Sequence, residues 1–421
     1  MNSANDSLEK LDITLTSRNL AKQIFAADLP EQYIKRIPAQ TLYIALKRNG
    51  LQSSADLLEI ASLEQCRLMI DFDCWQKSYF YEDNFWEWLA LTTEGDDLAL
   101  LQKMLKCFDL KIITLLIAKH VQYEFVEEPT DNPPGPGYFT PDKGRTWLSI
   151  NIEDSDRHFL FGRLLALIFE TDANLFYKLL SLSTTQTSTV LEEEAYLDKS
   201  KRLYAEGIPE YEIAAEVNNP ANENSISAAL KEVEGKNGPA KIIDIQAVEP
   251  LIFDSSLTKL LSQLLQDMTI REDLENELTY IMNGAIVMWD TEFYEYERVM
   301  HLTDKVKGAI NLGLEKCQEL SNLSAIEIYK KIGLIKVYQL GLTQLKKLRT
   351  TVNEAKKVAK ESLAPEIELI FASVIQPLPE MPVSLKEGYK SEDAGNSISA
   401  NTAPIEHLSE IRRITQMITS S

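Results

Sequence analysis

The sequence has few cysteines, no long apolar run and none of the common catalytic signatures. Its four cysteines, Cys66, Cys74, Cys107 and Cys317, form neither a CxxC pair nor a zinc-type spacing, so we expect reduced thiols in a cytosol. The longest charge-free apolar-rich run, 278–289, is far too short to cross a bilayer. The first residues do not read as a signal peptide. We therefore expect a soluble, cytoplasmic protein without a membrane span.

Basic residues are also in short supply. The chain of 421 residues has 43 Lys and Arg against 64 Asp and Glu, a formal charge of −21. Such a surface repels nucleic acid and anionic membranes. We find no HExxH, GxSxG, P-loop or GxGxxG motif, and no paired Glu-x-x-His of the di-iron type. We accordingly expect no metal and no cofactor.

Apolar residues make up 44% of the chain, enough for a real core, and their spacing is mainly helical. We predict a mainly α fold: a superhelix-like array of short helices, a small β-hairpin insert and a C-terminal bundle of longer helices. Ser62 and Gln65 predict a capping box for the helix that follows. Tyr138–Thr140 and Thr146–Ile152 read as the two strands of the hairpin. We place a helix break near Asn283 and Gly284.

The predicted organisation has eight parts. These are a disordered N-terminus (1–16), the short-helix array (17–121), a loop and β-hairpin (122–155), a helical segment with a tight corner (156–219), a linker (220–245), the long-helix bundle (246–375), a flexible Pro/Ser/Gly tail (376–404) and a terminal amphipathic helix (405–421).

Three stretches, 42–75, 191–217 and 313–348, resemble an uncharacterised bacterial family, domain-of-unknown-function family 6178. The most specific pieces are Asp71-x-Asp73-x-Trp75 and the Glu-Glu-Glu-Ala-Tyr helix before the corner at Gly207-x-Pro209. The resemblance implies no activity. Residues 29–75 are also similar, in the spacing of leucines and prolines, to the helical cytoplasmic N-domain of magnesium transporters of the MgtE type.

Two groups of residues are candidate sites. The first is a polar set around the corner, in which Asp198 and Arg202 are spaced to pair along one helix and Glu212 and Glu216 could face a cation or Arg202. Asp71 and Asp73 have a spacing used for divalent metals, but capping by Asp73 of a helix at Trp75 is the simpler interpretation. The candidate polar residues are Asp71, Asp73, Trp75, Glu193, Glu194, Arg202, Glu212 and Glu216.

The second group could bind a protein partner. Lys346, Arg349, Lys356 and Lys360 can line one side of a helix, as a face for an acidic partner or for the protein's own acidic half. Leu408, Ile411 and Ile418 form the apolar stripe of the last helix, which either folds back onto the body or docks on a partner. The leading functional hypothesis is a helical scaffold or regulatory interaction protein; the alternatives are a metal-assisted hydrolase or transferase and, third, nucleic-acid binding through the basic face.

Overall fold

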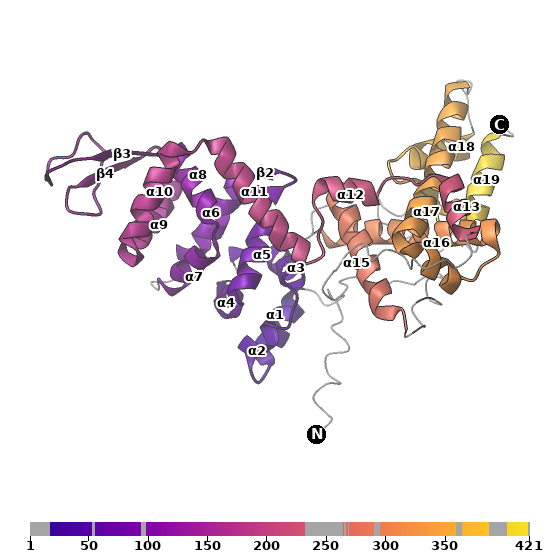
Figure 1. Ribbon diagram of the computed structural model, residues 1–421, viewed down its shortest axis with the longest axis horizontal. Coiled ribbons are helices and arrows are strands. Elements are labelled where there is room, and N and C mark those ends of the chain that lie inside the picture. Colours follow the sequence, from indigo (N-terminus) through magenta and orange to yellow (C-terminus); the bar gives the residue numbers. More distant parts are fainter. Residues whose placement is uncertain are drawn as a thin grey trace. The chain divides into compact units, whose positions relative to one another are not determined.

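The computed structural model describes residues 17–52, 55–93, 98–231, 269–289, 295–358, 364–386 and 402–419, with the single positions 264 and 267. The fold is mainly α, as predicted (Figure 1). The chain divides into two compact units, 1–203 and 204–421. The expected disordered start (1–16), most of the expected linker and Lys360 lie outside the described residues.

Unit 1 begins with helices of 5 to 12 residues and ends with three longer ones, α9 to α11. In chain order its elements are α1 (Ser17–Ala26), α2 (Pro30–Ile34), α3 (Ala39–Asn49), α4 (Ala55–Ile60), α5 (Leu63–Cys74), β1 (Trp75–Gln76), β2 (Tyr79–Phe80), α6 (Glu82–Ala90), the 3-10 turn η2 (Leu91–Thr93), α7 (Ala99–Cys107), α8 (Leu110–His120), β3 (Val121–Phe125), β4 (Thr146–Ile150), α9 (Ser155–Thr171), α10 (Ala173–Thr185) and α11 (Ser188–Ala205). The capping box of Ser62 and Gln65 is confirmed, with both reciprocal bonds present at the start of α5.

Unit 2 contains longer helices around one apolar core. Its elements are α12 (Tyr211–Val217), α13 (Glu223–Lys231), α15 (Arg271–Met288), α16 (Tyr296–Ser321), α17 (Ala325–Val358), α18 (Pro365–Val374), β5 (Glu380–Pro382), the 3-10 turn η3 (Val383–Leu385), β6 (Thr402–Pro404) and α19 (Leu408–Thr419). α17 carries a kink at Gly333, whose φ of 72° is left-handed. α16 and α17 pack closely, because Gly313 and Gly341 let the two backbones approach each other.

The expected hairpin pairs differently from the prediction. Thr146–Ile150 is indeed a strand, but its partner is Val121–Phe125, directly after α8, and not the nearer segment 138–140. That segment contributes only an isolated bridge, Phe139 to Leu148. The strand after α8 has a weak signal of its own, and the prediction favoured the shorter loop.

Two further predictions differ from the structure: the helix break near Asn283 and Gly284, and the start of the linker. α15 runs without interruption through Asn283 and Gly284, because both are buried against the corner that follows α11. The Asn283 side chain donates to the carbonyl of Gly207 at 3.1 Å. The first part of the expected linker is likewise helical: α13 buries Ile226 and Leu230, which are four residues apart on one face.

Much of the expected flexible tail is packed. β5 pairs antiparallel with β6, and Met381 is fully buried in the core of unit 2. α19 folds back on the same core, which buries Leu408 and Ile418 and partly buries Ile411. Of the two alternatives predicted for this apolar stripe, folding back onto the body or docking on a partner, the structure shows the first. Glu315 of α16 fixes the start of α19 by accepting from the backbone N–H of Leu408 at 2.8 Å.

Candidate functional site

Several residues of the predicted polar site lie on α5 and α11. In the structure a buried ion pair joins these two helices. The Arg202 guanidinium donates to both oxygens of Asp71, at 2.7 and 2.9 Å, and lies 3.6 Å from Asp109. Burial raises the pKa of Asp71, and Arg202 opposes that shift. The bidentate geometry is that of an ionised pair. The spacing of Asp198 and Arg202 predicted that these two residues would pair along one helix. In the structure Arg202 pairs with Asp71 instead.

Asp73 anchors three other side chains instead of capping a helix. It lies inside α5, only 6% exposed, and accepts from the Tyr43 hydroxyl and the Trp88 indole, each at 2.8 Å. Lys47 lies 2.7 Å away and supplies the counter-charge. The capping interpretation is wrong because α5 ends at Cys74, and Trp75 begins a strand. Both acids of the DxD pattern are thus satisfied by groups of the chain itself.

The remaining members of the polar set do not join this cluster. Glu193 is exposed, and Glu194 lies 3.5 Å from Lys111, whose closer partner is Asp198 at 2.6 Å. Glu212 and Glu216 are exposed on α12 of unit 2. Within the described ranges, no group of three or more His, Cys, Asp or Glu side chains is arranged to hold a metal ion.

Trp75 lies on a small aromatic shelf at the β1–β2 hairpin. Its ring is 5.5 Å from Phe80 and 6.0 Å from Tyr196 of α11, and the Lys199 ammonium lies over both Trp75 and Tyr196. The contacts fix α11 on the hairpin, a structural role for Trp75.

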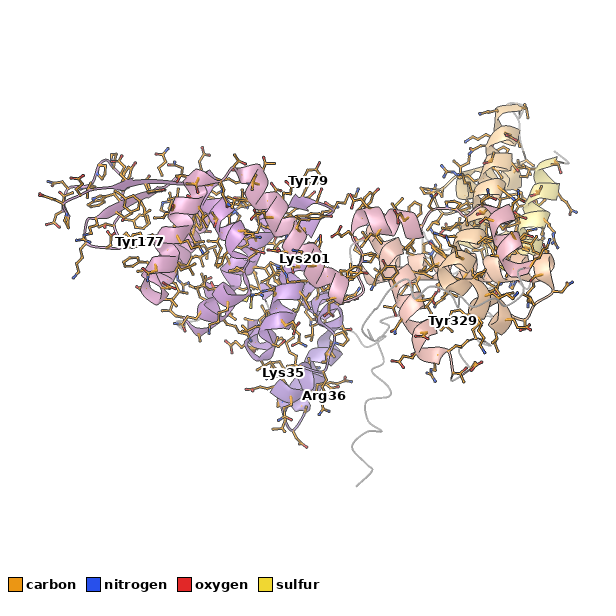
Figure 2. The ribbon with its side chains drawn as sticks, in the orientation of Figure 1. Lys35, Arg36, Tyr79, Tyr177, Lys201 and Tyr329 are labelled. Atoms are coloured by element: carbon orange, nitrogen blue, oxygen red, sulfur yellow. The ribbon has the colours of Figure 1, made fainter. Side chains whose placement is uncertain are left out.

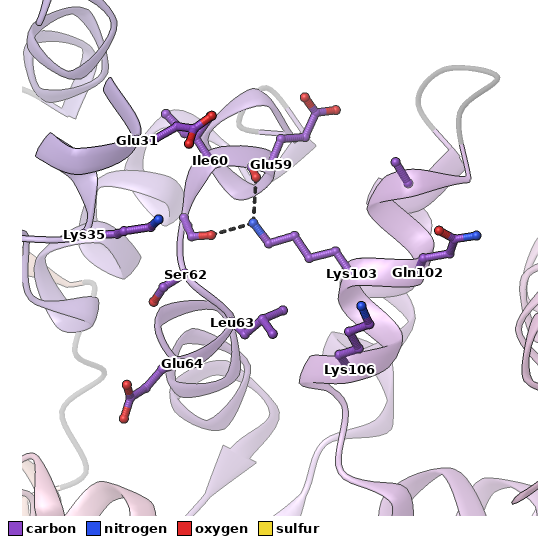
Figure 3. A pocket seen from close by; sticks show the side chains of 12 residues that line it. Glu31, Lys35, Glu59, Ile60, Ser62, Leu63, Glu64, Gln102, Lys103 and Lys106 are labelled. Atoms are coloured by element: carbon purple, nitrogen blue, oxygen red, sulfur yellow. Dashed lines mark hydrogen bonds between the residues drawn. The ribbon is translucent and has the colours of Figure 1, made fainter. Parts of the chain in front are cut away.

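A cleft of about 670 Å³ opens between α2, α4, α5 and α7 of unit 1 (Figure 3). Sequence reasoning missed it, because its walls come from four short helices. Acidic side chains and lysines line the cleft together with apolar residues. The lining residues are Glu31, Lys35, Glu59, Ile60, Ala61, Ser62, Leu63, Glu64, Ala99, Gln102, Lys103 and Lys106.

Lys103 bridges one end of this cleft. Its ammonium reaches from α7 to the C-terminal end of α4 and donates to the carbonyls of Glu59 and Ala61 at 2.7 and 2.5 Å (Figure 3). It also donates to the carbonyl of Leu58 at 2.7 Å. A cation at this end of a helix satisfies carbonyls that have no intrahelical partner and interacts favourably with the helix dipole. Lys103 is thus part of the wall, whereas Lys35 and Lys106 are exposed at the rim.

Two buried thiols, Cys66 and Cys107, lie between α5 and α7. Their mutual hydrogen bond lowers the pKa of Cys107, helped by the charges of Arg67 and Lys103, and raises the pKa of Cys66, which burial raises further. Both side chains are at most 1% exposed. They are therefore core groups and not nucleophiles offered to the cleft.

The basic face on α17 is partly neutralised within unit 2. Lys347, beside the predicted Lys346, pairs closely with Glu223 of α13, and Lys331 donates to the carbonyl of Leu230. Lys346 and Lys356 are exposed and Arg349 is half-buried.

Residues 4–419 match the model of a family described as a family of unknown function, DUF6178. The chain belongs to this family. No curated protein and no solved structure matches it. The expected similarity of residues 29–75 to MgtE-type transporters therefore finds no support. In the described part of this family member, no helix is both long and apolar enough to span a membrane.

Proposed function

We propose that the protein is a cytoplasmic helical interaction protein, and that the cleft bridged by Lys103 receives a segment of a protein partner. The observation that carries this proposal is the composition of the cleft. Its lining includes the apolar residues Ile60, Leu63 and Ala99 beside exposed acids and lysines. Protein interfaces combine a desolvated apolar centre with a charged rim in this way.

The exposure of Leu63 supports the same function. Its side chain is 45% exposed at the first position of α5, inside the cleft. A partner side chain that covered it would remove apolar area from water, worth about 25 cal/mol for each Å². The alternative enzyme hypothesis relied on Asp71, Asp73 or the corner glutamates with a bound cation. Both aspartates are held by internal cations, and Glu212 and Glu216 are exposed on α12.

Photo-crosslinking tests the proposal. A photoreactive amino acid at Gln102, an exposed lining position, should cross-link a discrete partner in cells. Adding the Leu63→Arg substitution should abolish the cross-linked product, because it replaces an apolar side chain of the cleft with a charged one.

The matched control is Leu197→Arg. Leu197 is also 45% exposed but lies on α11, outside the cleft lining. The Leu197→Arg variant should leave the cross-link unchanged. Equal cross-linking by the Leu63→Arg and Leu197→Arg proteins would show that the cleft is not the binding site.

A further inference from the structure

The β3–β4 ribbon of unit 1 has one edge whose backbone groups point away from its own sheet. At its two ends the Asn151 N–H donates to the His120 carbonyl at 2.7 Å, and the Val126 N–H donates to the Arg145 carbonyl at 2.9 Å. The antiparallel register between these bonds makes Gln122 and Glu124 the residues that exchange hydrogen bonds with β4. The N–H and C=O groups of Tyr123 and Phe125 therefore face outward.

The outer edge of β4 is covered, whereas that of β3 is open. Leu148 of β4 exchanges hydrogen bonds with Phe139, at 2.8 and 2.9 Å. On β3, the Val121 N–H donates to the carbonyl of Ile117 in α8. The outward N–H groups of Tyr123 and Phe125 have no acceptor in the part of the chain that the structure describes.

This edge has few of the devices that keep edge strands from pairing, and Glu124 is its one charged residue. β3, VQYEF, contains no proline and no lysine, and its register with β4 has no bulge. Phe125 is 58% exposed. The strand is nevertheless held firmly: the Tyr123 hydroxyl donates to the Leu180 carbonyl of α10 at 3.0 Å.

A second tie comes from Tyr177 of α10 (Figure 2). Its hydroxyl donates to Asp142 at 2.7 Å, and its ring lies 6.2 Å from that of Phe125. A pre-ordered edge loses little conformational entropy when another strand adds to it.

We propose that the open edge of β3 is a homodimerisation surface, on which two copies of the chain pair their β3 strands antiparallel about a twofold axis at Tyr123. The Tyr123 N–H of each copy donates to the partner's Tyr123 carbonyl. The Phe125 N–H donates to the partner's Val121 carbonyl. The two ribbons then form one continuous sheet.

The strand is self-complementary in this register, which favours a second copy as the occupant. Val121 lies opposite the partner's Phe125, so that an apolar side chain meets an aromatic one. Glu124 lies opposite the partner's Gln122, so that no like charges meet. A register centred on Glu124 would bring two glutamates together. One centred on Gln122 would leave Phe125 without a strand residue opposite it.

Cysteine cross-linking tests the dimer and its register in the full chain. The four native cysteines are buried, so Gln122→Cys and Glu124→Cys each introduce one exposed thiol. These positions form a non-hydrogen-bonded pair across the proposed dyad, with Cα atoms about 4.5 Å apart, within reach of a disulfide. A mixture of the two variants should form a disulfide-linked dimer on mild oxidation, and neither variant alone should do so efficiently.

Charge variants give an independent readout by sedimentation velocity. Gln122→Glu places like charges opposite each other on both sides of the dyad and should weaken the dimer about fivefold. The double variant Gln122→Glu with Glu124→Gln again places a glutamate opposite a glutamine, now with the two positions exchanged. It should restore the affinity of the dimer. A chain that stays monomeric at every concentration, or that cross-links as well through Gln122→Cys alone as in the mixture, would overturn the proposal.

Discussion

The guanidinium of Arg202 donates to both carboxylate oxygens of Asp71, and so joins two residues 131 positions apart in the sequence. Asp71 is only 4% exposed. Two ionised groups in such a place stabilise each other but are costly to separate, because either one left alone would keep its charge away from water. The pair fixes α11 against α5 in unit 1.

Replacing the cation should therefore destabilise the protein strongly. We expect Arg202→Met to lower the free energy of unfolding by roughly 3–5 kcal/mol, the usual effect of removing one partner from a buried pair. Urea denaturation of the full chain measures it. Lys201→Met, which changes a neighbouring exposed side chain, should cost less than ~0.5 kcal/mol. A similar small loss for Arg202→Met would show that the pair contributes little to stability.

A second prediction concerns the crossing of α16 and α17. A Cβ atom at Gly341 would lie 1.7 Å from the carbonyl oxygen of Ala309, which is backbone and cannot move aside independently. We expect Gly341→Ala to destabilise the protein by about 3 kcal/mol or more, because the helices would have to separate.

The control for this prediction is Gly284→Ala in α15. There the nearest atom to an added Cβ is 3.6 Å away, an ordinary contact. Alanine favours a helix over glycine by up to ~1 kcal/mol, so this variant should be unchanged or slightly more stable. Thermal unfolding of the two variants side by side would decide; equal melting temperatures would contradict the steric argument.

Local signals were predictable from the sequence, and pairings between distant segments were not. The capping box of Ser62 and Gln65 depends on residues three apart, and the structure reproduces it. The partner of Arg202 was expected at Asp198, one helical turn away, because sequence spacing reveals only neighbours on the same helix. Asp71, the actual partner, could be identified as a candidate residue but not paired.

The tail and the cleft show the same limit. Low apolar content hid the packing of Met381, because a strand of three residues is too short to show a periodicity. Lys103 has no sequence signal at all, since its acceptors are backbone carbonyls more than 40 residues away. Clefts made from several short helices appear only after the fold has brought those helices together.

The pH dependence of stability should show the contribution of Glu380. Burial alone would raise its pKa, but the close contacts of its carboxylate with His301 and Lys305 and the hydrogen bond from Thr402 lower the pKa of Glu380 to about 2 from the usual 4.5. Because the folded state lowers this pKa, the resulting stabilisation is complete above about pH 4.5 and is lost as the pH falls towards 2. It amounts to roughly 3 kcal/mol.

Acid unfolding followed by circular dichroism tests this assignment. Glu380→Gln should lower stability at pH 7 and make it less dependent on pH between 4.5 and 2. Glu368→Gln, at an exposed position of α18, should leave the acid transition where it is. An unchanged acid transition in the Glu380→Gln protein would mean that other carboxylates control it.

The wall of the cleft can be tested separately from its ligand, through the three carbonyls that Lys103 holds. Lys103→Met keeps the aliphatic part of the side chain but removes the ammonium, so the C-terminal end of α4 loses the donor that caps it. Hydrogen bonds to a charged group contribute about 1.5–3 kcal/mol, and we expect a loss of stability in that range. Hydrogen exchange should accelerate in residues 55–61.

Lys106→Met, three residues further along α7 at the exposed rim, should leave exchange in α4 unchanged, because its ammonium holds none of these carbonyls. Faster exchange in both variants would trace the effect to the charge of the rim, and no change in either would show that α4 holds its end without a cap.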